Sequence, residues 1–126
     1  MAGSRRLEPQ APLSAQVFQI LLSLIDSDMH GYALIQDIRE RTRGEISLTA
    51  STLYAATKRL RDAGWIDEVD LDTPPPDHDD RRRYYRISAD GRAAARAEAL
   101  RLERLTSMAR DKRLLGALRA QPKGSR

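Results

Sequence analysis

Residues 49–70 read TASTLYAATKRLRDAGWIDEVD, and this stretch decides the fold. Apolar side chains recur in it at intervals of three and four residues, at Leu53, Ala56, Leu60 and Ala63. This spacing predicts an amphipathic helix from about Thr49 to Ala63, with Gly64 closing it. Residues 65–70 then have strand-like composition. The stretch therefore predicts a helix that buries one face and leads directly into a β-strand.

The other face of this helix carries hydroxyl groups, an aromatic ring and cations. Its residues are Ser51, Tyr54, Ala55, Lys58, Arg59 and Asp62. The hydroxyls of Ser51 and Thr52 lie beside the free backbone N–H groups at the start of the helix, an arrangement that binds phosphate. Lys58 and Arg59 follow within two turns, in reach of a flanking phosphate or a guanine edge. The alternative is that Ser51 or Thr52 only caps the helix and that both cations are solvated.

Two further helices are predicted upstream. Ser14 is the expected N-cap of a helix over residues 15–25, which is apolar around most of its circumference and therefore central. A second helix is predicted from about His30 to Glu40, with Gly44 in the left-handed conformation after it. Residues 45–48 form an extended connector. Helix, helix, turn and amphipathic helix is the order of a helix-turn-helix.

Three ring-bearing side chains have expected roles. Tyr32 either contacts a phosphate through its hydroxyl or packs in the core. His30 is expected to be a turn or helix-start residue and not a ligand. Trp65 is expected to anchor the third helix against the strand that follows.

Residues 65–70 and 82–87 predict a β-hairpin, because both runs have strand-like composition and the residues between them contain three prolines. A hairpin after a helix-turn-helix is a wing. The arginines at its base are expected to contact phosphates, Arg83 foremost; they are Arg81, Arg82 and Arg83. The alternative is that they pair with Asp77, Asp79 and Asp80 of the same loop. Tyr84 and Tyr85 point to opposite faces, so one is expected in the core and the other exposed or at the junction with the C-terminal helix.

A long C-terminal helix is predicted from Ser88, its N-cap, to about Ala120. At 1.5 Å per residue, thirty residues extend about 45 Å, which exceeds what the small domain before them covers. The uncovered part needs another chain, so we expect a homodimer. The predicted interface consists of Phe18, Leu100, Leu105, Met108, Leu115 and Leu118.

The composition favours an anionic partner and argues against catalysis. The chain has 126 residues, a net charge of +4 and a pI near 9.8. Cysteine is absent, so disulfides, thiolate metal sites and cysteine nucleophiles are excluded. No phosphate-binding Gly-rich loop, G-x-S-x-G or H-E-x-x-H motif occurs. We therefore expect no enzyme, no cofactor and no metal site, including at His78 in the acidic loop.

The expected organisation is a flexible arm over residues 1–12, a winged helix-turn-helix domain over 13–88, a dimerisation helix over 89–120 and a flexible tail over 121–126. No signal peptide is recognisable, and the most hydrophobic segment, residues 17–25, is shorter than the roughly 20 residues that span a bilayer. We expect a cytoplasmic protein without membrane contact. Its fold class is mainly α with a small β-hairpin.

Several blocks of this sequence resemble the PadR family of transcriptional regulators. They are HGYAL (30–34), STLY (51–54), KRL (58–60), AGWI (63–66) and RRYYRISADG (82–91). The resemblance extends from residue 15 to about 110. The short C-terminal region is similar to the compact branch of the family, which has a single dimerisation helix.

The resemblance implies a homodimeric repressor that binds a palindromic operator and is released by a small hydrophobic or aromatic effector. The residues expected to contact DNA are Tyr32, Ser47, Thr49, Ser51, Thr52, Tyr54, Lys58, Arg59, Arg81, Arg82 and Arg83. The alternative is a winged-helix adaptor whose basic face binds an acidic protein. Salt dependence separates the two, because binding through several phosphates weakens steeply as salt rises.

Overall fold

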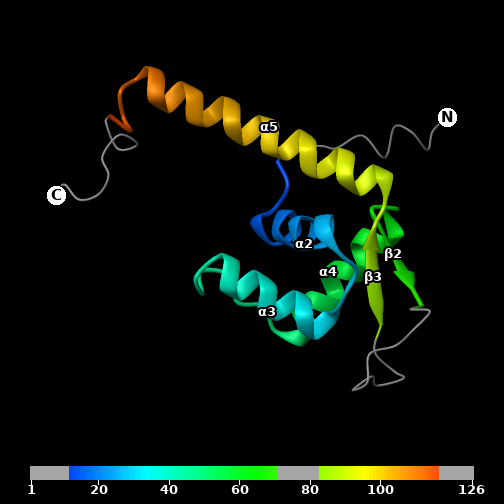
Figure 1. Ribbon diagram of the computed structural model, residues 1–126. Helices are drawn as coiled ribbons and strands as arrows, with labels where there is room; N and C mark the ends of the chain where they lie inside the picture. The colour runs from blue at the N-terminus through cyan, green and yellow to red at the C-terminus, as the bar shows by residue number, and fades with distance from the viewer. Residues whose placement is uncertain (1–11, 71–82, 117–126) are drawn as a thin grey trace.

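The computed structural model describes residues 12–70 and 83–116. The elements in chain order are α2 (Ala15–Asp26), β1 (Met29–His30), α3 (Gly31–Arg41), α4 (Ala50–Asp62), β2 (Ile66–Val69), β3 (Tyr84–Ile87) and α5 (Ala89–Asp111). Figure 1 shows α5 along one side of the fold, with α2 between it and α3. The predicted class is confirmed: a mainly helical winged helix-turn-helix followed by one long helix.

The sheet has three antiparallel strands in the order β1-β3-β2. The β2–β3 hairpin was predicted, whereas β1 was not. In the hairpin Ile66 pairs with Ile87 and Glu68 pairs with Tyr85. Since side chains alternate along a strand, Ile66, Tyr85 and Ile87 share the face that packs on the core.

The prediction that one tyrosine of the pair is exposed or meets the C-terminal helix is wrong for Tyr84. Both tyrosines are buried. Tyr84 lies opposite His30 in the β1–β3 ladder, and the His30 ring meets its ring edge-on at 5.2 Å. The His30 ring on the unpredicted strand β1 therefore covers one side of Tyr84.

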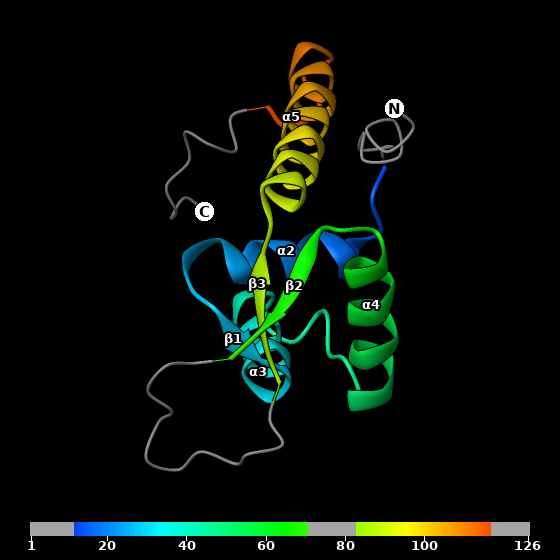
Figure 2. The same ribbon diagram turned by 90° about the vertical axis from the view of Figure 1, so that its right-hand side faces the viewer.

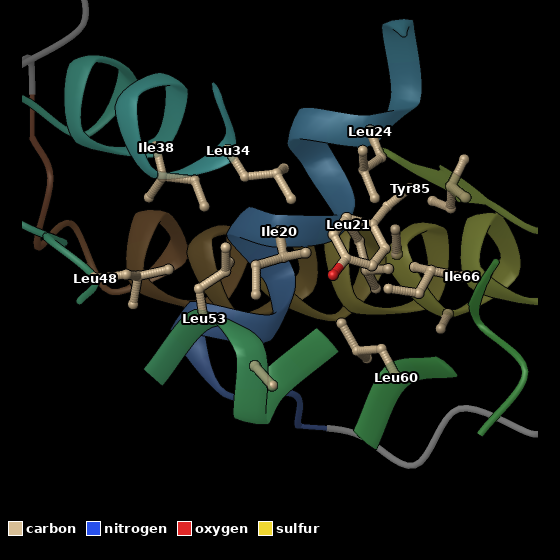
Figure 3. Packing of buried hydrophobic residues seen from close by; sticks show 14 residues of the cluster. Ile20, Leu21, Leu24, Leu34, Ile38, Leu48, Leu53, Leu60, Ile66 and Tyr85 are labelled. Carbon is tan, nitrogen blue, oxygen red and sulfur yellow. The ribbon is translucent and has the colours of Figure 1, made fainter. Parts of the chain in front are cut away.

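The core lies around α2, as predicted from its apolar circumference. Ile20, Leu21 and Leu24 of this helix are fully or almost fully buried. Figure 3 shows side chains from α3, α4 and the sheet converging on them: Leu34, Ile38, Leu53, Leu60, Ile66 and Tyr85. Each fully buried aliphatic side chain stabilises the fold by about 1.5–3 kcal/mol. This packing fixes which face of α4 points outward.

The helix ends differ from the predictions in one important place. Gly64, with φ of 82°, closes α4 as predicted. Helix α5, however, ends at Asp111 and not near residue 120. Arg113 adopts a φ of 63°, and Leu114 N–H donates to the Ala109 carbonyl at 3.0 Å, so the last turn is capped and closed. The helix is therefore about 34 Å long, from its 23 residues.

Small residues dock α5 on the rest of the fold. Gly91, Ala94, Ala95 and Glu98 are its buried residues. Glu98 accepts hydrogen bonds from the Arg101 guanidinium at 2.6 Å and from Leu13 N–H at 3.2 Å. The bonds from Arg101, aided by Leu13, outweigh the effect of burial and lower the pKa of Glu98 below its ordinary value. The start of α2 is thereby tied to the middle of α5.

Candidate nucleic-acid interface

Thr49, directly before α4, caps the helix, which corrects the capping alternative raised for Ser51 and Thr52. With an extended φ of −82° and ψ of 163°, Thr49 is the N-cap. Its Oγ1 accepts from Thr52 N–H at 3.1 Å and donates to Thr52 Oγ1 at 3.0 Å. Ser51 and Thr52 lie in the first helical turn, where their exposed side chains flank the positive end of the helix.

The two faces of α4 separate as the periodicity predicted, apart from Ala63, which directly follows the helix. Leu53, Ala56 and Leu60 are buried, and Thr57 is buried with them. Ala63, predicted on the same apolar stripe, is exposed because it is the C-cap and lies past the packed turns. One side of α4 is therefore committed to the core and the other is free for a partner.

The outward face of α4 has the expected chemistry. Its exposed residues are Ser51, Thr52, Tyr54, Ala55, Lys58 and Arg59. Lys58 Nζ lies 3.2 Å from Asp62 Oδ2, and both side chains are largely exposed, so this ion pair is weak. Among the described residues Arg59 makes no ion pair. Ser47 is exposed in the connector before the helix.

Tyrosine side chains extend this face towards the start of α3. Tyr54 is 51% exposed and lies so close to Gly31 that a Cβ there would be 3.0 Å from Tyr54 Oη. Tyr32 is 62% exposed, which rules out the core-packing alternative. Its hydroxyl accepts from Gln36 Nε2 at 2.9 Å. His30 caps α3 by accepting from Ala33 N–H through Nδ1, as expected of a helix-start residue.

The loop end of the hairpin supplies Arg83, an exposed cation directly before β3. Its Nη1 lies 3.3 Å from Oε2 of Glu68 on β2, a partner that the sequence did not suggest. Arg81 and Arg82 lie outside the described residues, as do the loop acids Asp77, Asp79 and Asp80, and His78. No group of three His, Cys, Asp or Glu side chains in the described part of the chain is arranged to hold a metal ion.

A cavity of about 460 Å³ joins α4 to the hairpin. It is lined by Tyr54, Thr57, Lys58, Arg61, Arg83 and Tyr85. Figure 2 shows α4 standing beside β2 and β3. The predicted residues Tyr54, Lys58 and Arg83 are thus brought together, and Arg61 joins them. Arg61 was missed, although its position three residues after Lys58 puts both on neighbouring parts of the helix surface.

A model of the transcriptional regulator PadR-like family matches residues 20–97 of this chain. The chain belongs to the PadR family. A transcriptional regulator from Clostridium thermocellum is 30% identical, with a TM-score of 0.61 over 76% of this chain and 89% of that one. A PadR family regulator from Clostridium difficile shares the fold, with a TM-score of 0.67 at 21% identity over 78% and 97% of the two chains.

A protein of Lysinibacillus sphaericus is 32% identical to this PadR-family chain over 74 residues. That match covers 59% of this chain and 65% of the relative's length. The family match begins in α2 and ends in α5, so it includes α4 and the whole sheet. The face described above therefore lies in the part of the chain that defines a family of DNA-binding transcriptional regulators.

The outer half of α5 in this PadR-family protein carries exposed apolar side chains. Leu100, Leu105 and Met108, predicted for the interface, are exposed on the helix. Leu115 is half-buried in the turn after α5, Phe18 is half-buried in α2, and Leu118 lies outside the described residues. Leu102, which was not among the predicted interface residues, is also exposed. In the described ranges no helix has both the length and the apolar character needed to cross a membrane.

Proposed function

We propose that this PadR-family protein binds a palindromic DNA operator as a homodimer, with α4 in the major groove and the β2–β3 hairpin along the backbone. One observation carries the proposal. The face of α4 opposite the core offers Ser51, Tyr54, Lys58 and Arg59 to the outside, and it adjoins Arg83 of the hairpin. The inner face of the same helix is fixed by Leu53 and Leu60.

The chemistry of this face suits a duplex. Hydroxyls beside a helix N-terminus bind phosphate through side chain and backbone together. Arg59 has no internal ion-pair partner among the described residues and is long enough to donate two bonds to a guanine edge. Lys58 and Arg83 are exposed cations on either side of the cavity, placed for the flanking backbone. Position on the duplex and reading of its sequence therefore come from different residues.

Family membership and the exposed apolar residues of α5 support the remaining parts of the proposal. A homodimer presents two copies of α4 to two half-sites, which makes the operator palindromic. The proposed role is that of a repressor, which blocks transcription in the cytoplasm while it occupies its operator. A small hydrophobic or aromatic effector would release DNA by binding the free dimer more tightly than the DNA-bound form.

Replacing Lys58 or Arg83 with alanine will weaken DNA binding about tenfold without unfolding the protein. Each substitution removes one phosphate contact, so the slope of log affinity against log salt should also fall by about one. The measurement is fluorescence anisotropy with a duplex selected from a random-sequence library. The salt concentration is varied from about 50 to about 200 mM KCl, a range over which binding through phosphates weakens steeply.

Arg110→Ala is the matched control, because it removes an exposed cation from α5, away from the proposed DNA interface on α4 and the hairpin. Its affinity should stay close to that of the unchanged protein. Equal affinities for all three variants would overturn the assignment of these residues. Binding that is indifferent to salt, or that occurs only with an acidic protein, would overturn the proposed function and favour the adaptor.

A further inference from the structure

The cavity between α4 and the hairpin is strongly basic. Lys58 and Arg61 reach it from α4 and Arg83 from the start of β3, while Tyr54 and Tyr85 supply aromatic walls. None of the described residues that line it is acidic. Three cations around one cavity repel one another unless an anion lies between them.

The anion that lies between two of them is the Glu68 carboxylate. A single oxygen, Oε2, accepts from Arg61 Nη1 at 2.5 Å and from Arg83 Nη1 at 3.3 Å. Glu68 pairs with Tyr85 in the hairpin, so its side chain lies on the face of the sheet that carries the cavity. One acid of β2 thus holds together an arginine of α4 and the arginine that directly precedes β3.

Two guanidinium groups converging on one oxygen is the arrangement that binds an oxyanion. The internal carboxylate holds this position only loosely, because exposed ion pairs contribute little net free energy. The side chains of Arg61 and Glu68 are each just over a third exposed, and that of Arg83 is mostly exposed. A phosphate group presents several acceptor oxygens to both arginines and to Lys58, so it competes well with a single carboxylate.

We propose that this cavity is the seat of one DNA backbone phosphate, and that Glu68 occupies the two arginines in the free protein and is displaced on binding. The inference rests on the proposed function and deepens it. Arg61 becomes a phosphate-binding residue, and Glu68 becomes a residue that lowers the affinity for DNA. In the bound state Arg61 and Arg83 hold the same phosphate, which fixes the hairpin relative to α4.

The test is a comparison of Glu68→Gln with Asp67→Asn in binding a 30-base-pair duplex of mixed sequence, about three helical turns long. Both variants remove one exposed negative charge from β2, but Asp67 points to the opposite face of the sheet. Glu68→Gln should tighten binding about fivefold, the value of one exposed ion pair. Asp67→Asn should change it at most about twofold, because its charge acts at long range through salt.

Arg61→Ala completes the experiment. It should weaken binding, lower the salt slope by about one, and reduce the gain from Glu68→Gln when the two changes are combined. Equal gains from Glu68→Gln and Asp67→Asn, or weaker binding by Glu68→Gln, would overturn the phosphate seat. Arg59→Ala keeps the two proposals distinguishable, because Arg59 does not line the cavity. If Arg59→Ala weakens DNA binding while Glu68→Gln and Arg61→Ala leave it unchanged, the proposed function stands and the phosphate seat fails. Thermal melts of every variant establish that the fold is intact.

Discussion

Replacing Leu102 and Leu105 together with lysine will turn the proposed dimer into a monomer and weaken operator binding by about 100-fold or more. Two linked recognition helices gain about two to four orders of magnitude in affinity over one, and a monomer loses this gain. The same substitutions leave each domain folded, because both side chains are exposed in the single chain. The expected loss is therefore one of assembly and not of stability.

The reason lies in the direction of the docking face of α5. At about 100° per residue, Leu102, Leu105 and Ala109 continue the line of Gly91, Ala94 and Glu98, which pack on the chain's own core. The residues of this line up to Glu98 are buried, whereas those beyond it are not: Leu102 is 37% exposed and Leu105 is 46% exposed. Met108, 58% exposed, lies along its edge. A second copy of the chain would bury this outer part, where a lysine ammonium is strongly disfavoured.

Glu103→Lys is the control for the charge itself, since Glu103 is exposed about 160° around the helix from Leu105. Sedimentation velocity should show a dimer for this variant and a monomer for the leucine variant. A dimer that survives both leucine substitutions would place the interface elsewhere and remove the basis for a palindromic operator.

Gly91→Ala will destabilise the protein by about 3 kcal/mol, despite the better helix propensity of alanine, and lower the melting temperature by more than about 10 °C. A Cβ at this position would lie 2.2 Å from the Trp65 carbonyl oxygen and 2.8 Å from Ile87 Cγ1. The Trp65 oxygen is backbone held by Ser88 N–H at 2.9 Å, so it cannot move aside alone. Helix α5 must then shift away from the sheet.

Ala93→Leu tests the same turn of α5 on its exposed side, where a larger side chain meets solvent. Its unfolding curve in urea should coincide with that of the unchanged protein. If the melting temperature of Gly91→Ala equals or exceeds that of the unchanged protein, the close approach of α5 to residue 65 is refuted.

The helix-turn-helix was predictable because its signals are local. Ser14 and Ser88 cap helices where expected, and Leu53 and Leu60 repeat at helical spacing. The outward face of α4 follows once that spacing is read. The role of Thr49 as the N-cap of α4 was not predicted. Three hydroxyl residues lie within four positions there, and the sequence alone does not show which of them is the cap.

Long-range features were not predictable in the same way. Strand β1 is only two residues long and forms by pairing with the edge of β3. No residue near it in the sequence signals this pairing, because β3 lies far along the chain. Arg113 ends α5 in a left-handed conformation within a run of good helix formers. Periodicity also left the direction of the α5 stripe open, so Leu102 was missed: Gly91, by its contact with Trp65, sets which side docks.

The candidate site divides along the same line. Residues of one helix, such as Lys58 and Arg59, were found from their own spacing. The Glu68 bridge was not, because it depends on the hairpin register and on the place of α4 beside the sheet. Arg81 and Arg82 remain predictions.

The central claim is that the exposed face of α4 enters the major groove, and the absence of cysteine permits a direct test. Ala55→Cys places a single thiol on that face, and Ala93→Cys places one on α5, on the far side of α2 from α3. Each is coupled to an iron–EDTA group that cleaves nearby DNA, with the selected operator as substrate. The account predicts two cleavage clusters from position 55, about 10 base pairs or a multiple apart and offset as for a major-groove cutter, and none from position 93. Cleavage from position 93 without cleavage from position 55 would contradict it.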